Sequence, residues 1–177
     1  APFNKPIQEI TYFTCLKMLS ETVGKMPIKF YAKGRQEAEA NKVYYLLKHR
    51  PNPVMTPTTF WTAVENNRNH FGNAYVWIQS EFNRKKYGGD YSVKGLWIMP
   101  SSDVTVIVDD KGVFGGKGDI YYWYSDKYSG ESYFFRSHEV LHFKTSTTFD
   151  GITGASVREI LKSSIDGAIA AQNFKNN

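Results

Sequence analysis

The sequence predicts an α+β fold with N-terminal helices, an antiparallel β-meander of hairpins and a C-terminal amphipathic helix. Before residue 72, apolar residues recur at helical spacing, and proline or glycine ends each run. Residues 74–144 instead hold short β-branched and aromatic runs separated by turn residues. Because helices precede strands without regular alternation, a dinucleotide-binding fold of βαβ units is excluded.

The first helix is predicted from apolar residues that recur at intervals of three and four, and Pro27 ends it. Its expected buried face consists of Cys15, Met18, Leu19, Thr22, Val23 and Met26. The lone Cys15 is therefore expected to be a small buried apolar residue. A strand over Ile28–Tyr31 should follow, closed by a turn at Lys33–Arg35.

The next segment predicts two helices separated by a break. A polar stretch, Gln36–Ala40, precedes a short helix over Val43–Arg50, and Pro51-Asn52-Pro53 stops that helix. Thr56 is a good N-cap and Pro57 suits the first position of the next helix. Gly72 supplies its end.

Alternating apolar and aromatic runs predict the strands. One hairpin joins Ala74–Ile78 to Val93–Met99 across a basic loop, Arg84–Asp90. A second hairpin joins Ile120–Tyr124 to Ser132–Phe135 around Ser129-Gly130, and further strands are expected at Val104–Val108 and Val140–Lys144. Ser156 and Glu159 form a capping box that opens the last helix. That helix carries Val157, Ile160, Leu161, Ile165, Ala168 and Ile169 on one face.

Composition limits the class of protein. The 177 residues suit one α+β domain spanning 1–177, with 41% hydrophobic and 22% charged residues. The net charge of +5 permits contact with nucleic acid without requiring it. A single cysteine excludes a disulfide framework and indicates a reducing compartment. No apolar run approaches the roughly 20 residues of a membrane helix. The first residue is Ala1 and no strong cap ends the chain, so we expect a piece of a longer protein.

The segment His138-Glu139-Val140-Leu141-His142 matches the H-E-x-x-H motif of zinc proteases. That motif needs a helix, whereas the flanking residues favour a strand. No histidine follows His142, and Glu159 already has a role in the capping box. We therefore expect a single turn from Ser137 that leads into a strand, without a bound metal, and keep a zinc hydrolase only as the alternative.

Two further segments have both a structural and a ligand-binding interpretation. Arg84-Lys85-Lys86 forms a basic hairpin tip that could contact phosphates, although a solvated loop is the simpler interpretation. Tyr121–Tyr124, with Tyr122 and Trp123, resembles aromatic platforms for sugars or single-stranded bases. Alternate residues of a strand face opposite sides, so a core and an interface are favoured over a platform.

Several motifs, taken in order, resemble the portal proteins of tailed double-stranded-DNA phages. The resemblance covers nearly the whole chain. Its most specific parts are Arg50-Pro51-Asn52-Pro53 and Gly72-Asn73-Ala74-Tyr75. The other matching parts are residues 14–23, 26–31, 45–47, 55–56 and 60–61, the positions Leu96, Ile98, Pro100 and Val104, the segments Glu139-Val140-Leu141-His142-Phe143 and Asp150-Gly151-Ile152-Thr153-Gly154, and the final helix. The sequence departs from the family pattern in a long hairpin tip, Phe82–Tyr91, and in Ser156-Val157, where the family often has proline.

The resemblance implies a structural protein without catalytic activity or cofactor. Portals form a homo-oligomeric ring, dodecameric in mature particles, at one capsid vertex. Double-stranded DNA passes through the ring, the terminase large subunit docks on it, and the major capsid protein and a head–tail adaptor contact it. The protein would act in the virion and assemble in the cytoplasm of the bacterial host. The chain would be the N-terminal wing, with the helix over 155–177 leading toward the stem. A nucleic-acid or carbohydrate-binding module remains the other alternative.

Overall fold

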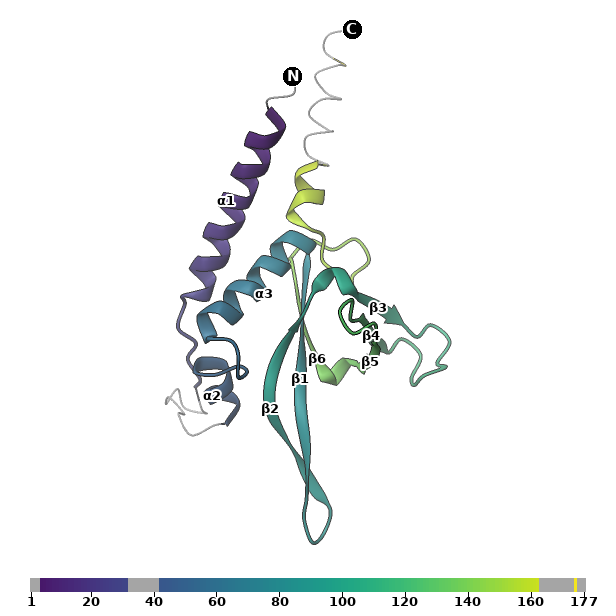
Figure 1. Cartoon of the computed structure of the whole chain (residues 1–177). Helices are drawn as coiled ribbons and strands as arrows, with labels where there is room; N and C mark the ends of the chain where they lie inside the picture. The colour runs from purple at the N-terminus through teal and green to yellow at the C-terminus, as the bar shows by residue number, and fades with distance from the viewer. Residues whose placement is uncertain (1–3, 32–41, 163–173, 175–177) are drawn as a thin grey trace.

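The computed structural model describes residues 4–31, 42–162 and 174, and they form helices packed on two stacked three-stranded sheets (Figure 1). The helices are α1 (Asn4–Gly24), α2 (Lys42–Lys48) and α3 (Pro57–Phe71), with single 3₁₀ turns η1 (Ser101–Asp103) and η2 (Ser137–Glu139). The strands are β1 (Asn73–Arg84), β2 (Gly89–Met99), β3 (Val104–Val108), β4 (Ile120–Ser125), β5 (Ser132–Arg136) and β6 (Val140–Lys144). The α+β class with two hairpins is confirmed.

Helix α3 begins and ends where its local sequence dictates. The Thr56 hydroxyl accepts a hydrogen bond from the Thr59 N–H at 3.2 Å, and Pro57 occupies the first turn. Gly72 ends the helix with a left-handed φ of 81°. The helix buries Phe60 and Val64 against the first sheet, whose strands are in the order β2-β1-β6.

Strand β1 is buried on both faces because it lies between α3 and the second sheet. Ala74 and Val76 point toward Phe60 of α3, in one hydrophobic cluster. Tyr75 points the other way and packs with Tyr122 of β4, in a second cluster. The second sheet has the order β3-β4-β5, so the fold has a helical layer and two sheet layers.

Helix α1 packs on α3 through a different face from the expected one. Its buried residues are Leu16, Ser20 and Gly24, whereas Met18 is 65% exposed and Cys15 is also exposed. The prediction of a buried cysteine is therefore wrong. The small residues Ser20 and Gly24 on this face let the backbones of α1 and α3 approach closely: a Cβ on Gly24 would lie 2.8 Å from the Thr58 carbonyl oxygen.

The strand expected over Ile28–Tyr31 is also wrong. Residues 27–30 have no regular structure, and Tyr31 forms only an isolated bridge. The Phe30 ring packs instead near the Tyr44 ring of α2, with centroids 6.1 Å apart. The turn at 33–35 and the polar stretch 36–40 lie outside the described residues, as does the last helix beyond residue 162. Among the described helices, none is long and apolar enough to cross a membrane.

The small face of α1 gives a stability prediction. We expect Gly24→Leu to lower the free energy of unfolding by about 1–3 kcal/mol, because the new side chain would push α1 away from α3. Urea unfolding followed by circular dichroism measures the change. Thr22→Leu places the same side chain on the exposed side of this turn and serves as the control. Equal stability of the two variants would contradict the close packing.

Candidate functional site

The described residues converge on one buried polar junction, centred on Asn73 at the start of β1. The Asn73 side chain is 8% exposed and forms paired hydrogen bonds with one residue, Gly154. Its Oδ1 accepts from the Gly154 N–H at 2.8 Å, and its Nδ2 donates to the Gly154 carbonyl at 2.9 Å. The side-chain amide therefore acts as a short piece of β-strand for the loop 145–155.

Two glycines allow this junction to close. A Cβ on Gly72 would lie 2.6 Å from the Ala155 carbonyl carbon, and a Cβ on Gly154 would lie 2.7 Å from the Thr145 nitrogen. The Thr145 N–H also donates to the Gly72 carbonyl at 3.0 Å. The corner between α3 and β1 thus crosses the 145–155 loop in direct backbone contact, which only residues without side chains permit.

His142 connects the junction to the second sheet. Its Nε2 donates to Asn73 Oδ1 at 2.8 Å, and its Nδ1 lies 3.2 Å from the Tyr122 hydroxyl, which donates to it. Burial lowers the pKa of His142 to about 4, and the nearby Lys144 charge acts in the same direction. The neutral ring, protonated on Nε2, satisfies both partners at once.

This arrangement removes the basis for a zinc centre. Ser137–Glu139 forms a 3₁₀ turn and Val140–Lys144 a strand, as expected, so His138 and His142 do not share a helical face. Both ring nitrogens of His142 already have hydrogen-bond partners. No group of three metal-ligating side chains occurs among residues 4–31 and 42–162.

A second polar anchor is Asn52, in the proline-flanked stretch after α2. It is 2% exposed. Its Nδ2 donates to the Leu96 carbonyl at 2.9 Å, while its Oδ1 accepts from the Met55 N–H at 2.9 Å. The Leu96 N–H donates in turn to the Pro51 carbonyl at 2.7 Å. Pro51 and Asn52 therefore cover the free edge of β2, and Pro53 lies exposed beyond them.

The loop that carries Gly151 is stabilised by its own hydrogen bonds at the residues that precede the junction. Asp150 Oδ1 accepts from the Ile152 and Thr153 N–H groups, and Gly151 takes a left-handed φ of 75°. The Thr153 hydroxyl is the main cause that holds the pKa of Asp150 below its usual range. Ser156 and Glu159 then form the expected capping box, with Glu159 Oε2 accepting from the Ser156 N–H at 2.8 Å.

The remaining candidate contact residues are separated by the fold. Arg84, Lys85 and Lys86 lie exposed at the far end of the β1–β2 hairpin. Trp123 is 41% exposed on the outer face of the second sheet, but Tyr122 is only 5% exposed. Because Tyr122 faces the first sheet, it cannot present its ring to a partner, and that part of the hypothesis is corrected.

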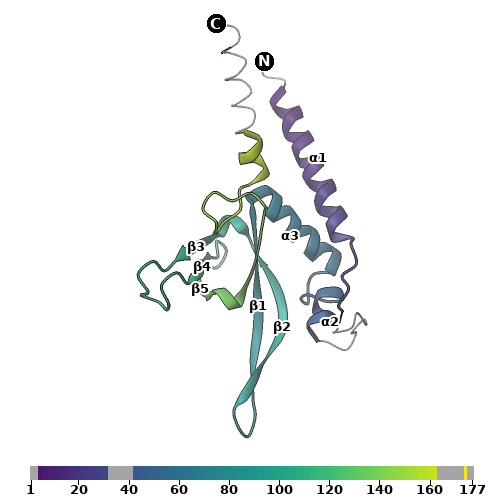
Figure 2. The ribbon, with the colours of Figure 1, turned by 180° about the vertical axis from the view of Figure 1, so that it is seen from behind.

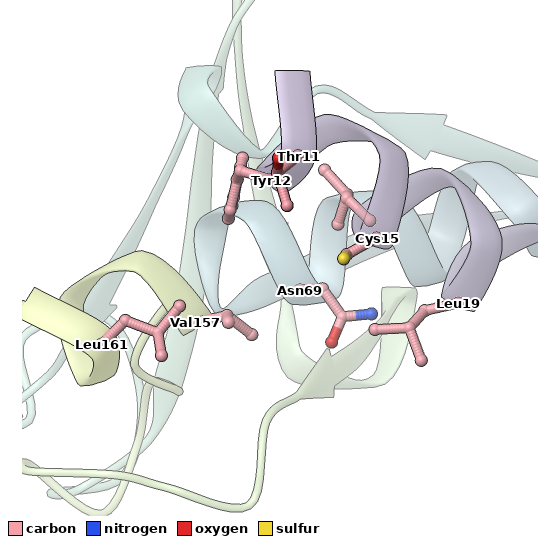
Figure 3. Close-up of a pocket in the computed structure, with 8 residues that line it drawn as sticks. Thr11, Tyr12, Cys15, Leu19, Asn69, Val157 and Leu161 are labelled. Carbon is pink, nitrogen blue, oxygen red and sulfur yellow. The ribbon is translucent and has the colours of Figure 1, made fainter. Parts of the chain in front are cut away.

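An open apolar groove of about 390 Å³ lies between α1, the end of α3 and the helical residues 157–162 (Figure 3). Its lining comprises Thr11, Tyr12, Cys15, Leu16, Leu19, Asn69, Val157 and Leu161. Figure 3 shows the Cys15 thiol and the Leu19 and Val157 side chains around this groove. No carboxylate, lysine or arginine lines it, so the groove suits apolar side chains.

Sequence reasoning identified the 72–75 corner, His142 and Gly154 separately, but it did not join them. It also missed Tyr122 as a buried hydrogen-bond donor and Ser101, whose hydroxyl donates to the Asn73 carbonyl at 2.8 Å. The local signal for the junction was the Gly72-Asn73 pair directly after a helix. Nothing in the neighbouring sequence indicated that the Asn73 side chain would bind Gly154, 81 residues along the chain.

Comparison with known proteins gives a consistent result. The family described as "Phage portal protein" matches residues 10–177. Protein BeeE of Escherichia coli (strain K12) is 32% identical over 73 residues, covering 40% of this chain and 46% of that protein. An uncharacterised protein of Rickettsia bellii (strain RML369-C) is 22% identical over 102 residues, covering 58% of this chain and 24% of that protein.

Solved structures share the fold. The neck of an empty gene transfer agent particle, computed with C6 symmetry, contains a chain that aligns with a TM-score of 0.66 and 20% identity. The alignment covers 93% of this chain and 41% of that one. The neck of the native particle, computed with C12 symmetry, gives a TM-score of 0.61 at 20% identity, covering 93% of this chain and 39% of that one. The present chain spans less than half the length of each of these relatives.

At the Asn73 junction, we expect a substitution that exchanges one amide group for a carboxylate to lower the stability of the fold strongly. Asn73→Asp replaces the Nδ2 donor by an oxygen that faces the Gly154 carbonyl, so we expect a loss of roughly 2–4 kcal/mol in unfolding free energy. Thermal and urea unfolding measure it. Asn83→Asp is the matched control, because its Ser92 partner can turn its hydroxyl and donate instead. A loss no greater than that of the control would contradict the role of Asn73.

His142 predicts a pH dependence. Its folded pKa is about 4, below the ordinary value of 6.5, so between those values the unfolded chain binds a proton that the folded chain does not. Stability should therefore fall as pH decreases from 6.5 to 4, by up to roughly 3 kcal/mol from this residue. His142→Gln should lose that part of the slope in urea unfolding across this range. Parallel slopes for both proteins would refute the assignment.

Proposed function

Because the chain belongs to the phage portal protein family, we propose that it is the N-terminal wing of a portal, the ring through which double-stranded DNA is packaged and ejected. The family match over residues 10–177 is the observation that carries the proposal. The fold supports it, since the chains of similar fold come from gene transfer agent necks.

The phage portal family is a family of structural proteins, and we infer that this chain has no catalytic activity. The polar residues that sequence reasoning singled out support this. His142 binds Asn73 and Tyr122, and Asn52 binds backbone groups. These side chains are engaged in hydrogen bonds that hold the molecule together.

The wing assignment concerns residues 1–177, with the helix over 155–177 directed toward the stem. The capping box at Ser156 fixes where that helix begins, directly after the junction at Gly154. In Figure 1 the described part of the helix leaves the body on the side opposite the tip of the β1–β2 hairpin. This polarity suits an element that connects a peripheral wing to a central part of a ring.

The proposed partners follow from the portal role. They are further copies of the chain in a ring, the major capsid protein, the terminase large subunit, a head–tail adaptor and the DNA in the channel. The protein would act at the portal vertex of the virion and assemble in the bacterial host cytoplasm. The C12 and C6 symmetries of the neck structures support a ring.

Electron microscopy of the intact parent protein tests the function. We expect negative-stain images of rings with a central channel. Matched samples of the variant Cys15→Ser, which changes an exposed thiol, should form the same rings. A monodisperse monomer across salt concentrations from low to physiological would contradict the portal assignment.

A further inference from the structure

The β1–β2 hairpin extends beyond the body of the molecule. Strand β6 pairs with β1 only over Asn73–Trp77, whereas β1 and β2 stay paired to Arg84 and Gly89. Residues 80–94, which we call the arm, form a two-stranded ribbon that projects away from the rest of the chain (Figure 2). Such a ribbon is only marginally stable in water by itself, so it gains from a partner.

The arm carries exposed aromatic rings. Phe82 and Tyr91 pair across the ribbon, with ring centroids 5.1 Å apart, and are 51% and 76% exposed. Tyr87 at the tip is 86% exposed. Tyrosine and arginine are enriched among the residues that dominate protein–protein binding energies. The arm therefore has the composition of a protein-binding element.

The arm also has an uncompensated positive charge. Two ion pairs neutralise part of it, Lys94 with Glu81 at 2.8 Å and Lys85 with Asp90 at 2.9 Å. Arg84 has no carboxylate within ion-pair distance among the described residues. Lys86 lies 5.5 Å from the centroid of the neighbouring Tyr87 ring and also has no described carboxylate partner. Two free cations thus flank the aromatic tip.

The turn between β4 and β5 has the opposite charge. We call residues 125–133 the acidic turn. Its one lysine, Lys127, pairs with Asp103 of η1. Asp126 and Glu131 have no cationic partner among the described residues, and the Tyr128 ring beside them is 99% exposed. The Asp126 carboxylate accepts hydrogen bonds from the Tyr128 N–H and the Ser129 hydroxyl, and Asp126 is half-buried. The Glu131 carboxylate accepts one from the Tyr133 hydroxyl, and Glu131 is exposed. Two anions and an exposed ring therefore complement the two cations and the rings of the arm.

The other projecting loop does not offer this match. In residues 109–119, Lys111 and Lys117 offset Asp110 and Asp119. Asp109 is 4% exposed and accepts three backbone N–H bonds within the loop. The acidic turn is thus the better complement of the arm.

We propose that the arm of one copy docks on the acidic turn of the next copy around a ring. The proposal rests on the portal function proposed above. A ring that closes by rotation needs two different, complementary patches on each copy, and the arm and the acidic turn are such a pair. Arg84 and Lys86 would face Asp126 and Glu131 of the neighbour, with the aromatic side chains between them.

Charge exchange in the intact parent protein tests the contact. The arm variant is Arg84→Glu with Lys86→Glu, and the turn variant is Asp126→Asn with Glu131→Lys. Each alone should raise the protein concentration needed for ring formation by about tenfold or more, because like charges then meet. An equal mixture of the two should restore rings, since alternating copies again bring opposite charges together. Lys111→Glu with Lys117→Glu changes the net charge as much as the arm variant and should assemble normally.

Mass photometry and negative-stain imaging count the rings, and a filter assay measures binding to a duplex DNA. Normal assembly by both variants would overturn the arm contact while leaving the portal function standing. Normal assembly by the arm variant with lost DNA binding would also overturn it and assign the arm to DNA. Rings that fail in the variants but do not return in the mixture would show that these patches do not face each other. Absence of rings in the unmodified protein would instead remove the portal function itself.

Discussion

The backbone crossing of Gly72 and Gly154, closed by the Asn73 amide, is the constraint on which the other contacts of this fold depend. At that point the end of α3, the start of β1, the end of β6 and the loop before the last helix all meet. A side chain on either glycine would separate them. Because Asn73 satisfies both the N–H and the carbonyl of Gly154, the buried loop has no unpaired backbone group there.

The layered packing follows from this crossing. With β1 fixed at its start, alternate side chains of the strand contribute to two cores, one under α3 and one under the second sheet. His142 also links the two sheets, since it accepts a hydrogen bond from Tyr122 in the second sheet and donates one to Asn73 in the first. Burial keeps its ring neutral, so a polar residue can join two aromatic layers without carrying a charge.

The organisation suits a component whose work is mechanical. The polar residues at the centre fix the geometry, while the most exposed tyrosine rings, Tyr87 and Tyr128, lie in the turns of the two hairpins, away from the cores. The starting point of the last helix is set by the Ser156 capping box and by the Gly154 contact. The point at which that helix leaves the two sheets is therefore set by the junction.

The amino-acid sequence by itself determined the features that arise within a few residues. Thr56, Pro57 and Gly72 set the ends of α3, Ser156 and Glu159 start the last helix, and alternation predicts both hairpins. Only the tertiary structure decided that α1 buries Leu16, Ser20 and Gly24, that the strands divide into two sheets, and that Asn73 meets His142. The physical reason is range. A cap or a turn is stabilised by groups up to about four residues away, whereas the face that a helix buries, and the partner that a buried amide needs, depend on segments that only folding brings together.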